Sequence, residues 1–455
     1  MDVFADKMGR IGAWCGQNKY LSAIKNAFQN FMPATIAGAV AVLWTCVIVN
    51  KDTGLGAFFA PIMALEPFNA VMNAMNTATI GMMAVGICML VGQEIAEANG
   101  ETGAYPAVLA FMMWLTVTPL SHTAAATITD ATGAKLTAEG LAALGLTVAD
   151  GSVSGIATAY TGTGGIFTGL IVGILGMELY GWLRRQDALK IKMPEQVPPG
   201  VARAFEVLVP TVIALVITGT IGWVVTLATG SCLNDLIAKY IQAPLKAIIG
   251  GNIVGIVIMY IIIMLFWMVG IHGNNMVSAI KEAILTPMIV ENMNAFAAGE
   301  KAPNVFNIVM CQMFAEWGGS GVTLGLVIAI FIFGKREDNR AVATLSVVPG
   351  LFNINETVTF GIPLVLNPIL DIPFVLAPCV CIIIGYVLTL IGFCPRCVVQ
   401  TPWTCPPIVM GFLATGGNIM GAVSQIIVMV VATVIYVPFI IAYEKQQNKE
   451  SAAAE

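Results

Sequence analysis

The sequence predicts an all-α protein that crosses a lipid bilayer many times. Hydrophobic residues make up 58% of the chain and charged residues only 10%, with a mean hydropathy of +0.85, whereas a soluble domain carries roughly 25% charged residues. The apolar residues come in runs of about 20, the length that a helix needs to cross a bilayer. Because these runs are continuous rather than alternating, the pattern excludes a transmembrane β-barrel.

The chain begins with an amphipathic stretch that is expected to lie on the cytoplasmic surface. Residues 1–26 carry four basic side chains but lack the short charged start and apolar core of a signal peptide. Apolar runs then predict nine membrane spans, at 27–50, 67–93, 104–121, 160–183, 204–229, 250–270, 317–335, 369–391 and 415–443. The segment 122–158, rich in Thr, Ala, Gly and Asp, is expected to form an external loop.

The positions of the basic residues predict a tenth span at 274–297. Hydropathy alone leaves this segment outside the bilayer, because it carries Lys281, Glu282 and Glu291. Basic residues cluster in four places, 1–26, 184–203, 335–340 and 445–449. The positive-inside rule puts all four in the cytoplasm, so an even number of crossings must separate the second cluster from the third. The polar segment therefore crosses, facing protein or water rather than lipid, and both termini are expected to be cytoplasmic.

Two apolar segments of the second half, near 341–366 and 393–414, are interrupted by prolines and polar residues. Such segments are tolerated at membrane depth only where they line a cavity, so they predict re-entrant hairpins and point to a binding site. Residues 231–250 show apolar positions at helical spacing with charges between them, which is typical of an amphipathic helix at the interface. The predicted organisation is a membrane domain of five spans over 1–230, this interfacial linker over 231–250, a transport domain over 251–443 and a cytoplasmic tail over 444–455.

Two ionisable residues are the main candidates for chemistry. His272 lies at the end of the sixth span between Gly270 and Gly273, and an ionisable group at membrane depth is by default functional; the alternative is a histidine that only bonds a neighbouring carbonyl. Glu356 follows Asn355 in the first hairpin, where a carboxylate is costly without a polar partner. Paired sugar hydroxyls are such a partner, and the alternative is a cluster that only caps a broken helix.

Other candidates carry weaker signals. Trp403, in the second hairpin, offers a flat apolar face that suits stacking on a sugar ring, with buried packing as the alternative. Glu291 with Asn292 either lines the same cavity or caps a helix end. The Cys394 and Cys397 pair has redox-type spacing, but no second pair and no surrounding βαβ pattern supports a metal or redox site.

Several motifs, in order along the chain, resemble those of one known family. They are Gly270-Ile271-His272-Gly273, the run 318–326, Ile354-Asn355-Glu356, Phe360-Gly361, Asn367-Pro368 and Pro402-Trp403-Thr404, preceded by Met32-Pro33, Val117-Thr118-Pro119 and the stretch 193–198. Together they resemble the lactose/cellobiose/diacetylchitobiose-type enzyme IIC of the bacterial phosphoenolpyruvate-dependent sugar phosphotransferase system. Thr357 stands where the family usually has proline, and Asn274 and Asn275 are more polar than is usual there.

The resemblance implies a homodimeric permease in the bacterial inner membrane that takes a β-linked disaccharide. Its first five spans form the dimer interface, and its second half holds the sugar between the two hairpins and moves across the membrane like an elevator. Carried onto this chain, the family's functional residues make Glu356 and His272 the groups at the reacting hydroxyl and Trp403 a stacking residue. We extend the predicted sugar site to Asn274, Asn353 and Asn355.

The resemblance also implies that the phosphate comes from a phosphocysteine on a IIB protein, itself supplied by IIA. The termini of this sequence are too short for a IIB domain of about 100 residues, so a separate cytoplasmic donor is expected near the basic loops at 184–203 and 335–340. No metal, cofactor, nucleic acid or phosphorylated residue of the chain itself is expected. The alternatives are an ion-coupled sugar transporter, disfavoured by the lack of an acidic relay, and a sugar sensor without transport.

Overall fold

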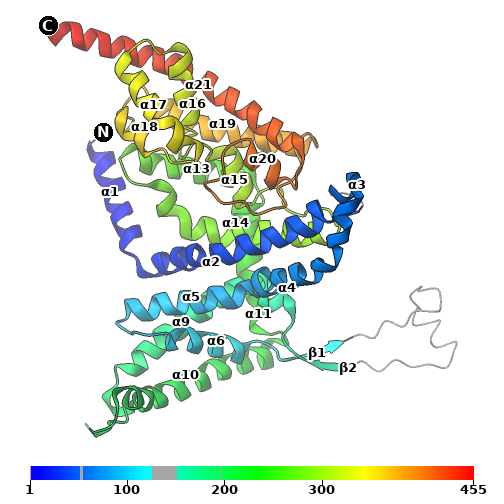
Figure 1. Ribbon diagram of the computed structural model, residues 1–455. Helices are drawn as coiled ribbons and strands as arrows, with labels where there is room; N and C mark the ends of the chain where they lie inside the picture. Colours follow the sequence, from blue (N-terminus) through cyan, green and yellow to red (C-terminus); the bar gives the residue numbers. More distant parts are fainter. Residues whose placement is uncertain (1, 52–54, 125–150, 195, 455) are drawn as a thin grey trace.

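The computed structural model describes residues 2–51, 55–124, 151–194 and 196–454 (Figure 1). The regular elements of the described chain are helices, apart from one antiparallel ribbon in which β1 (Ser121–Ala124) pairs with β2 (Gly151–Ser154). The predicted helical membrane fold is therefore confirmed. The ribbon occupies the two ends of the predicted external loop, and the rest of that loop lies outside the described residues.

The first half of the chain contains the helices up to residue 229. They are α1 (Asp2–Gln17), α2 (Lys19–Leu43), α3 (Leu55–Phe58), α4 (Asn69–Thr79), α5 (Met83–Ala98), α6 (Tyr105–Val117), α8 (Thr158–Thr161), α9 (Ile166–Arg184) and α10 (Pro199–Thr229). Short 3-10 or π-helical turns extend several of these helices, as at Trp44–Ile48 after α2 and Ala60–Phe68 before α4.

The second half begins with the predicted linker. Its helices are α11 (Leu233–Ile237), α12 (Ala243–Leu245), α13 (Ile253–Met268), α14 (Gly273–Ala297), α15 (Ile308–Ala315), α16 (Leu324–Phe333), α17 (Glu337–Leu351), α18 (Glu356–Gly361), α19 (Asp371–Leu390), α20 (Val409–Ala414) and α21 (Ile419–Ala454). The linker is helical over Leu233–Gly250 and bends by 77° where it meets α13. Its predicted place at the membrane surface stays a prediction.

Each predicted span contains a helix. Within the described residues, six helical segments are long and apolar enough to cross a membrane, and a seventh is the bent pair that ends in α13. Two shorter apolar helices, α6 and α16, correspond to two further predicted spans. The tenth predicted span is α14, a continuous helix of 25 residues; that it crosses the bilayer stays a prediction.

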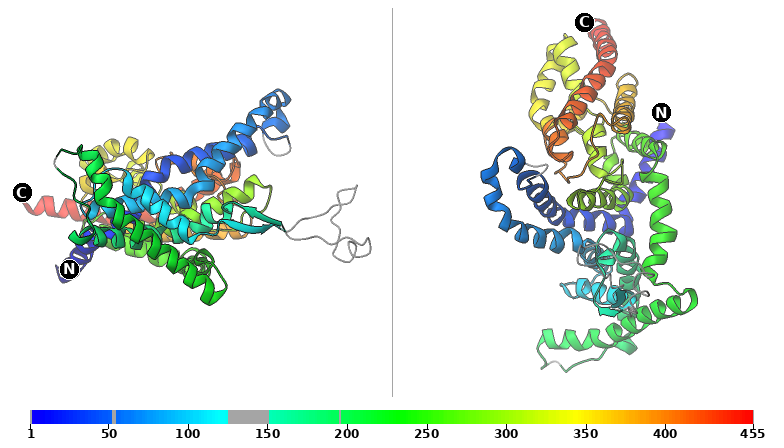
Figure 2. Two further views of the ribbon diagram at one scale, coloured as in Figure 1. Left: turned by 90° about the horizontal axis from the view of Figure 1, so that it is seen from below. Right: turned by 90° about the vertical axis from the view of Figure 1, so that its right-hand side faces the viewer.

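The two halves of the molecule meet along α2 and α14. Helices α5, α6, α9 and α10 pack together in one half, and α13, α16, α19 and α21 pack together in the other (Figure 1). Helix α2 contacts α5 on one side and α14 on the other. Both chain ends lie on one side of the molecule, and the β1–β2 ribbon projects from the opposite side (Figures 1 and 2).

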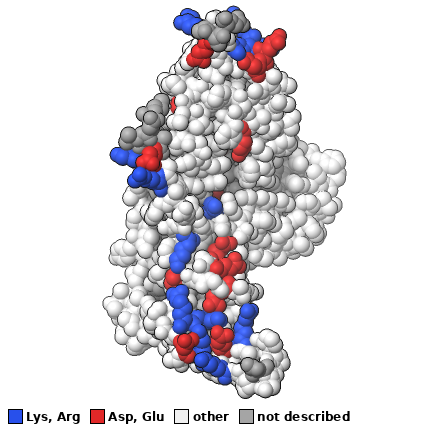
Figure 3. All heavy atoms as spheres, turned by 90° about the vertical axis from the view of Figure 1, so that its left-hand side faces the viewer, with Lys and Arg blue, Asp and Glu red and all other residues white. Residues whose placement is uncertain are grey.

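Charged side chains are exposed on the side that carries the chain ends. Figure 3 looks at this side and shows patches of Lys, Arg, Asp and Glu at its top, middle and bottom, separated by uncharged surface. The cytoplasmic location expected for the four basic clusters stays a prediction.

The interrupted segments differ from one another and from a simple pair of hairpins. Helix α17 continues through Pro349 to Leu351, so this proline does not interrupt the helix. A proline removes one backbone donor, and so close to the end of a helix that loss is tolerated. The break falls instead at residues 352–355, where Asn353 has φ 62°. The second segment is irregular from 391 to 408 and helical only in α20.

Candidate functional site

A cavity of about 240 Å³ lies in the second half, against α2. Its wall comes from α2, from α14, from the residues around the end of α15, from the break between α17 and α18, and from the irregular second segment. All six residues predicted to form the site line it: His272, Asn274, Asn353, Asn355, Glu356 and Trp403. Residues more than 130 positions apart in the sequence thus share one cavity.

His272 precedes the first turn of α14 and caps it. Its Nδ1 accepts a hydrogen bond of 3.3 Å from the backbone N–H of Asn275, and its ring lies 4.6 Å from the ring of Trp267, centre to centre. Because Nδ1 is an acceptor, the neutral ring carries its proton on Nε2 and has that donor to offer a ligand. The backbone partner is thus an N–H group and not the carbonyl of the alternative interpretation.

The two glycines beside His272 allow the backbone conformation and the close helix packing found there. Gly270 has φ 78°, a conformation that glycine adopts at little cost. A Cβ on Gly273 would lie 1.9 Å from the carbonyl oxygen of Ile263. Only glycine therefore lets α14 start this close to α13, which brings His272 to the cavity.

Glu356 is the first residue of α18 and is exposed to the cavity. Among the described residues, no group donates a hydrogen bond to its carboxylate or forms an ion pair with it. Both oxygens are therefore free to accept hydrogen bonds from a ligand. The carboxylate is also close enough to His272 for the two to interact electrostatically.

Asn353 joins three separate parts of the chain. Its Oδ1 accepts a hydrogen bond of 2.7 Å from the backbone N–H of Gly318, and its Nδ2 donates to the carbonyls of Trp403 (2.6 Å) and Cys405 (3.0 Å). With its amide fully engaged, Asn353 positions the cavity wall rather than offering groups to a ligand. Its left-handed backbone is one that asparagine tolerates better than most residues do.

Replacing Asn353 by Asp is expected to lower the stability of the protein and loosen the Trp403 segment. Asp keeps the acceptor for Gly318 but leaves the partly buried carbonyls of Trp403 and Cys405 without donors, at a cost of about 1–3 kcal/mol. The thermal midpoint in detergent is expected to fall and sugar affinity to drop about tenfold in calorimetry. The matched control is Asn367→Asp, at an exposed amide that donates only to Pro363. Equal losses of stability and of sugar affinity in the two variants would show that Asn353 has no special role.

Asn355 and Asn274 meet at Ser320. Asn355 Nδ2 donates to the carbonyl of Ser320 (3.0 Å), and Asn274 Nδ2 donates to its hydroxyl (3.2 Å). Gly319 has φ 90°, and a Cβ there would lie 2.5 Å from Cβ of Asn355, so the close approach requires glycine. Asn274 Oδ1 is buried without a partner among the described residues, and a buried unpaired acceptor at a cavity wall suits a ligand hydroxyl.

Trp403 presents one side to the cavity. It is 44% exposed, and its own carbonyl is held by Asn353. The buried-packing alternative does not apply to a ring this open, which leaves an apolar face for a ligand to cover.

The structure adds polar residues that sequence reasoning did not assign to the site. Lys281 and Glu316 form a buried ion pair of 2.7 Å at the cavity wall, and the hydroxyl of Tyr260 donates to the same Glu316 oxygen at 2.8 Å. Gln312 also lines the cavity, and its Oε1 is buried without a partner among the described residues. The sequence signal that could have found Gln312 and Glu316 is that each is a single polar residue in or beside an apolar segment. A buried charge in such a place needs a partner.

The remaining candidates lie elsewhere. Asn292 donates to the carbonyls of Asn304 and Cys397, both at 2.8 Å, while Glu291 pairs with Lys246. Neither is among the described residues that line the cavity, and both lie inside α14 rather than at its end, so the structure supports neither of the two alternatives. All ten cysteines are free thiols in the described chain, and Cys394 and Cys397 are buried.

Comparison with known proteins gives consistent matches over nearly the whole chain. The family model described as "Phosphotransferase system, EIIC" matches residues 25–378. The oligo-beta-mannoside-specific EIIC component of Bacillus subtilis (strain 168) is 32% identical over 444 residues, which is 96% of this chain and 93% of that protein. The cellobiose-specific EIIC component of Lactococcus lactis subsp. lactis (strain IL1403) is 31% identical over 480 residues, 97% of each chain.

A solved structure matches as well. The crystal structure of the transporter ChbC, the IIC component from the N,N'-diacetylchitobiose-specific phosphotransferase system, superposes with a TM-score of 0.86 at 28% identity. The match covers 97% of this chain and 98% of that one.

Proposed function

The chain belongs to the phosphotransferase system EIIC family, and on that premise we propose that it binds a β-linked disaccharide in the cavity beside Glu356 and translocates it for phosphorylation. It is a multi-pass membrane protein and a sugar permease component of this system. The similar proteins are named for oligo-β-mannoside, cellobiose and diacetylchitobiose, and these sugars define the class to be tested.

The observation that carries the proposal is the match between the cavity and a sugar. A pyranose presents hydroxyls around its rim and C–H groups on its faces. The cavity offers a free carboxylate in Glu356, a ring N–H donor in His272 and unpaired acceptors in Asn274 and Gln312. Trp403 supplies the flat apolar surface that suits the face of the ring. Asn353 and Asn355 hold this wall in place.

In the proposed reaction, Glu356 binds the hydroxyl that is to be phosphorylated. The hydroxyl oxygen attacks the phosphorus of a phosphocysteine on the IIB partner, and the S–P bond breaks as the O–P bond forms. The proton leaves the hydroxyl for the Glu356 carboxylate, which acts as general base, and the partner's cysteine leaves as thiolate. His272 orients the sugar through its Nε2–H.

The decisive experiment is reconstitution of the purified protein in vesicles. With cellobiose, lactose or diacetylchitobiose supplied outside and phosphorylated IIB inside, phosphorylated disaccharide is expected to accumulate in the lumen, unaffected by an uncoupler. Accumulation of free sugar without IIB, abolished by the uncoupler, would establish the ion-coupled alternative. Binding without any product in the presence of phosphorylated IIB would indicate a sensor.

Replacing His272 by Ala is expected to weaken sugar binding about fivefold to tenfold, the value of one neutral hydrogen bond. The control is His272→Asn, which keeps a side-chain acceptor suited to the helix cap but removes the ring N–H. Calorimetry is expected to show weak binding for both variants. Recovery of full affinity in His272→Asn would reduce the histidine to a capping role.

The assembly and topology are proposed as follows. The protein is a homodimer of the inner membrane with both termini in the cytoplasm, joined through its first five spans. Helix α10 supports this arrangement, because large apolar side chains remain exposed along it, including Leu208, Val212, Val216, Trp223 and Leu227. The second half then moves relative to the first in an elevator-like manner.

A further inference from the structure

Another cavity lies on the side of the molecule that carries the chain ends, and it shares no lining residue with the proposed sugar site. Its volume is about 480 Å³, and it is lined by residues from the end of α16 and the last turns of α21. Three of these residues are lysines: Lys335, Lys445 and Lys449. Among the described residues, none of the three ammonium groups has an ion-pair partner.

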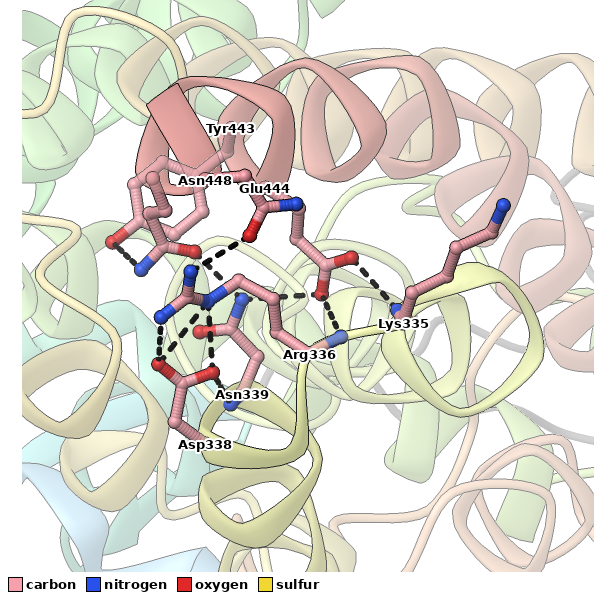
Figure 4. Close-up of polar contacts among 8 residues, drawn as sticks. Lys335, Arg336, Asp338, Asn339, Tyr443, Glu444 and Asn448 are labelled. Carbon is pink, nitrogen blue, oxygen red and sulfur yellow. Dashed lines mark hydrogen bonds and ion pairs between the residues drawn. The ribbon is translucent and has the colours of Figure 1, made fainter. Parts of the chain in front are cut away.

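The acidic residue of this cavity, Glu444, already accepts hydrogen bonds from the protein itself. Glu444 accepts hydrogen bonds from the backbone N–H groups of Lys335 (2.7 Å) and Arg336 (3.3 Å) and from the amide of Asn339 (3.1 Å) (Figure 4). Arg336 in turn binds Asp338 at 2.7 Å, and this contact holds the pKa of Asp338 below its usual value. Figure 4 shows the Lys335 side chain extending away from this network. The cavity therefore keeps an unbalanced positive charge.

An apolar groove continues directly from this basic cavity. It has a volume of about 800 Å³, and it shares Phe333 with the basic cavity. Along α21 the lining residues follow a spacing of three or four, so they form one stripe on one face of the helix. The stripe runs from apolar to basic: Ile426, Val430, Val434, Val437, Ile441, Lys445 and Lys449.

We propose that an anionic phospholipid occupies this site, with its phosphate among the three lysines and an acyl chain along the groove between α16 and α21. Charge complementarity selects an anion for the basic cavity, and anionic headgroups are known to favour basic pockets between membrane helices. The groove lies on the apolar part of a long membrane helix, where Val434 is 64% exposed. A soluble partner cannot reach that depth, whereas an acyl chain is already there.

The test is lipid retention by the full-length, detergent-purified protein, measured by native mass spectrometry with added phosphatidylglycerol. Phosphatidylcholine with the same chains is expected to bind weakly. The triple variant Lys335→Gln/Lys445→Gln/Lys449→Gln is expected to lose affinity on the order of a hundredfold. The matched control Lys192→Gln/Lys239→Gln/Lys301→Gln makes the same change in net charge at exposed positions outside the cavity and is expected to retain lipid as the wild type does.

A second variant tests the groove without touching the charges. Val434→Trp fills the apolar groove and is expected to reduce phosphatidylglycerol retention, with sugar binding unchanged as the check on folding. Equal loss in the control triple variant, or displacement of the lipid by equimolar glycerol phosphate, would overturn the lipid assignment. Normal lipid retention by the triple lysine variant would also overturn it. If that variant then lost IIB-dependent phosphorylation, the cavity would be a protein-docking surface. If it lost the dimer instead, the cavity would be a contact with a second copy of the chain.

Discussion

Replacing Glu356 by Gln is expected to abolish tight sugar binding. Gln has nearly the same shape but lacks the charge, and it exchanges one acceptor oxygen for a donor. A charge-assisted hydrogen bond contributes about 1.5–3 kcal/mol, so losing two to paired hydroxyls lowers affinity by at least about a hundredfold. Calorimetry with each candidate disaccharide measures the loss, and vesicles containing phosphorylated IIB are expected to form no product.

The control for Glu356 is Glu300→Gln, which removes the same charge at an exposed position. This variant is expected to bind and transport as the wild type does. Unchanged affinity together with normal phosphorylation in Glu356→Gln would contradict the assignment of this carboxylate to the sugar, and with it the proposed site. Normal binding with lost phosphorylation would instead restrict Glu356 to the role of base.

Replacing Lys281 by Met is expected to give the largest loss of stability. The side chains of Lys281 and Glu316 are only 6% and 13% exposed, and removing one partner from a buried ion pair costs about 3–5 kcal/mol, because the other charge stays buried. The hydroxyl of Tyr260 still donates to Glu316 but carries no compensating charge. Thermal unfolding in detergent measures the effect.

The double variant Lys281→Met/Glu316→Gln separates the two causes of this loss. With both charges removed and the Tyr260 hydrogen bond still available, stability is expected to recover toward the wild-type value. A single variant that unfolds like the wild type would show that the pair is solvated and of little structural importance. A double variant less stable than the single variant would show that each charge stabilises the protein by itself and that their pairing is not the cause.

The positions of the helices could be predicted from the sequence because they follow from local hydrophobicity. Each apolar run contains a helix, and the polar segment 274–297, which hydropathy alone missed, is the continuous helix α14. Its Lys281 and Glu282 face the cavity, as expected for charges that avoid lipid. The candidate site could be predicted for a similar reason, since polar residues in broken apolar segments need a partner.

The partners of those residues could not be predicted from the sequence. Asn353 binds groups at positions 318, 403 and 405, and no spacing rule links residues so far apart in the chain. Gln312 and Glu316 were missed because each is a single polar residue near an apolar segment, and only the packing shows what it faces. The 77° bend before α13 likewise depends on how the linker packs.

If the sugar binds in this cavity as proposed, the amide of Asn353 also limits how it can leave. Since the amide ties the break after α17 to the Trp403 segment and to the turn at Gly318, these three walls cannot part from one another without losing these hydrogen bonds. The wall formed by Gln29 and Met32 of α2 belongs to the other half of the molecule and has no such tie to Asn353. The route for entry and exit is therefore expected along α2, with the sugar-binding wall travelling as one piece and the first half acting as the fixed surface past which it moves.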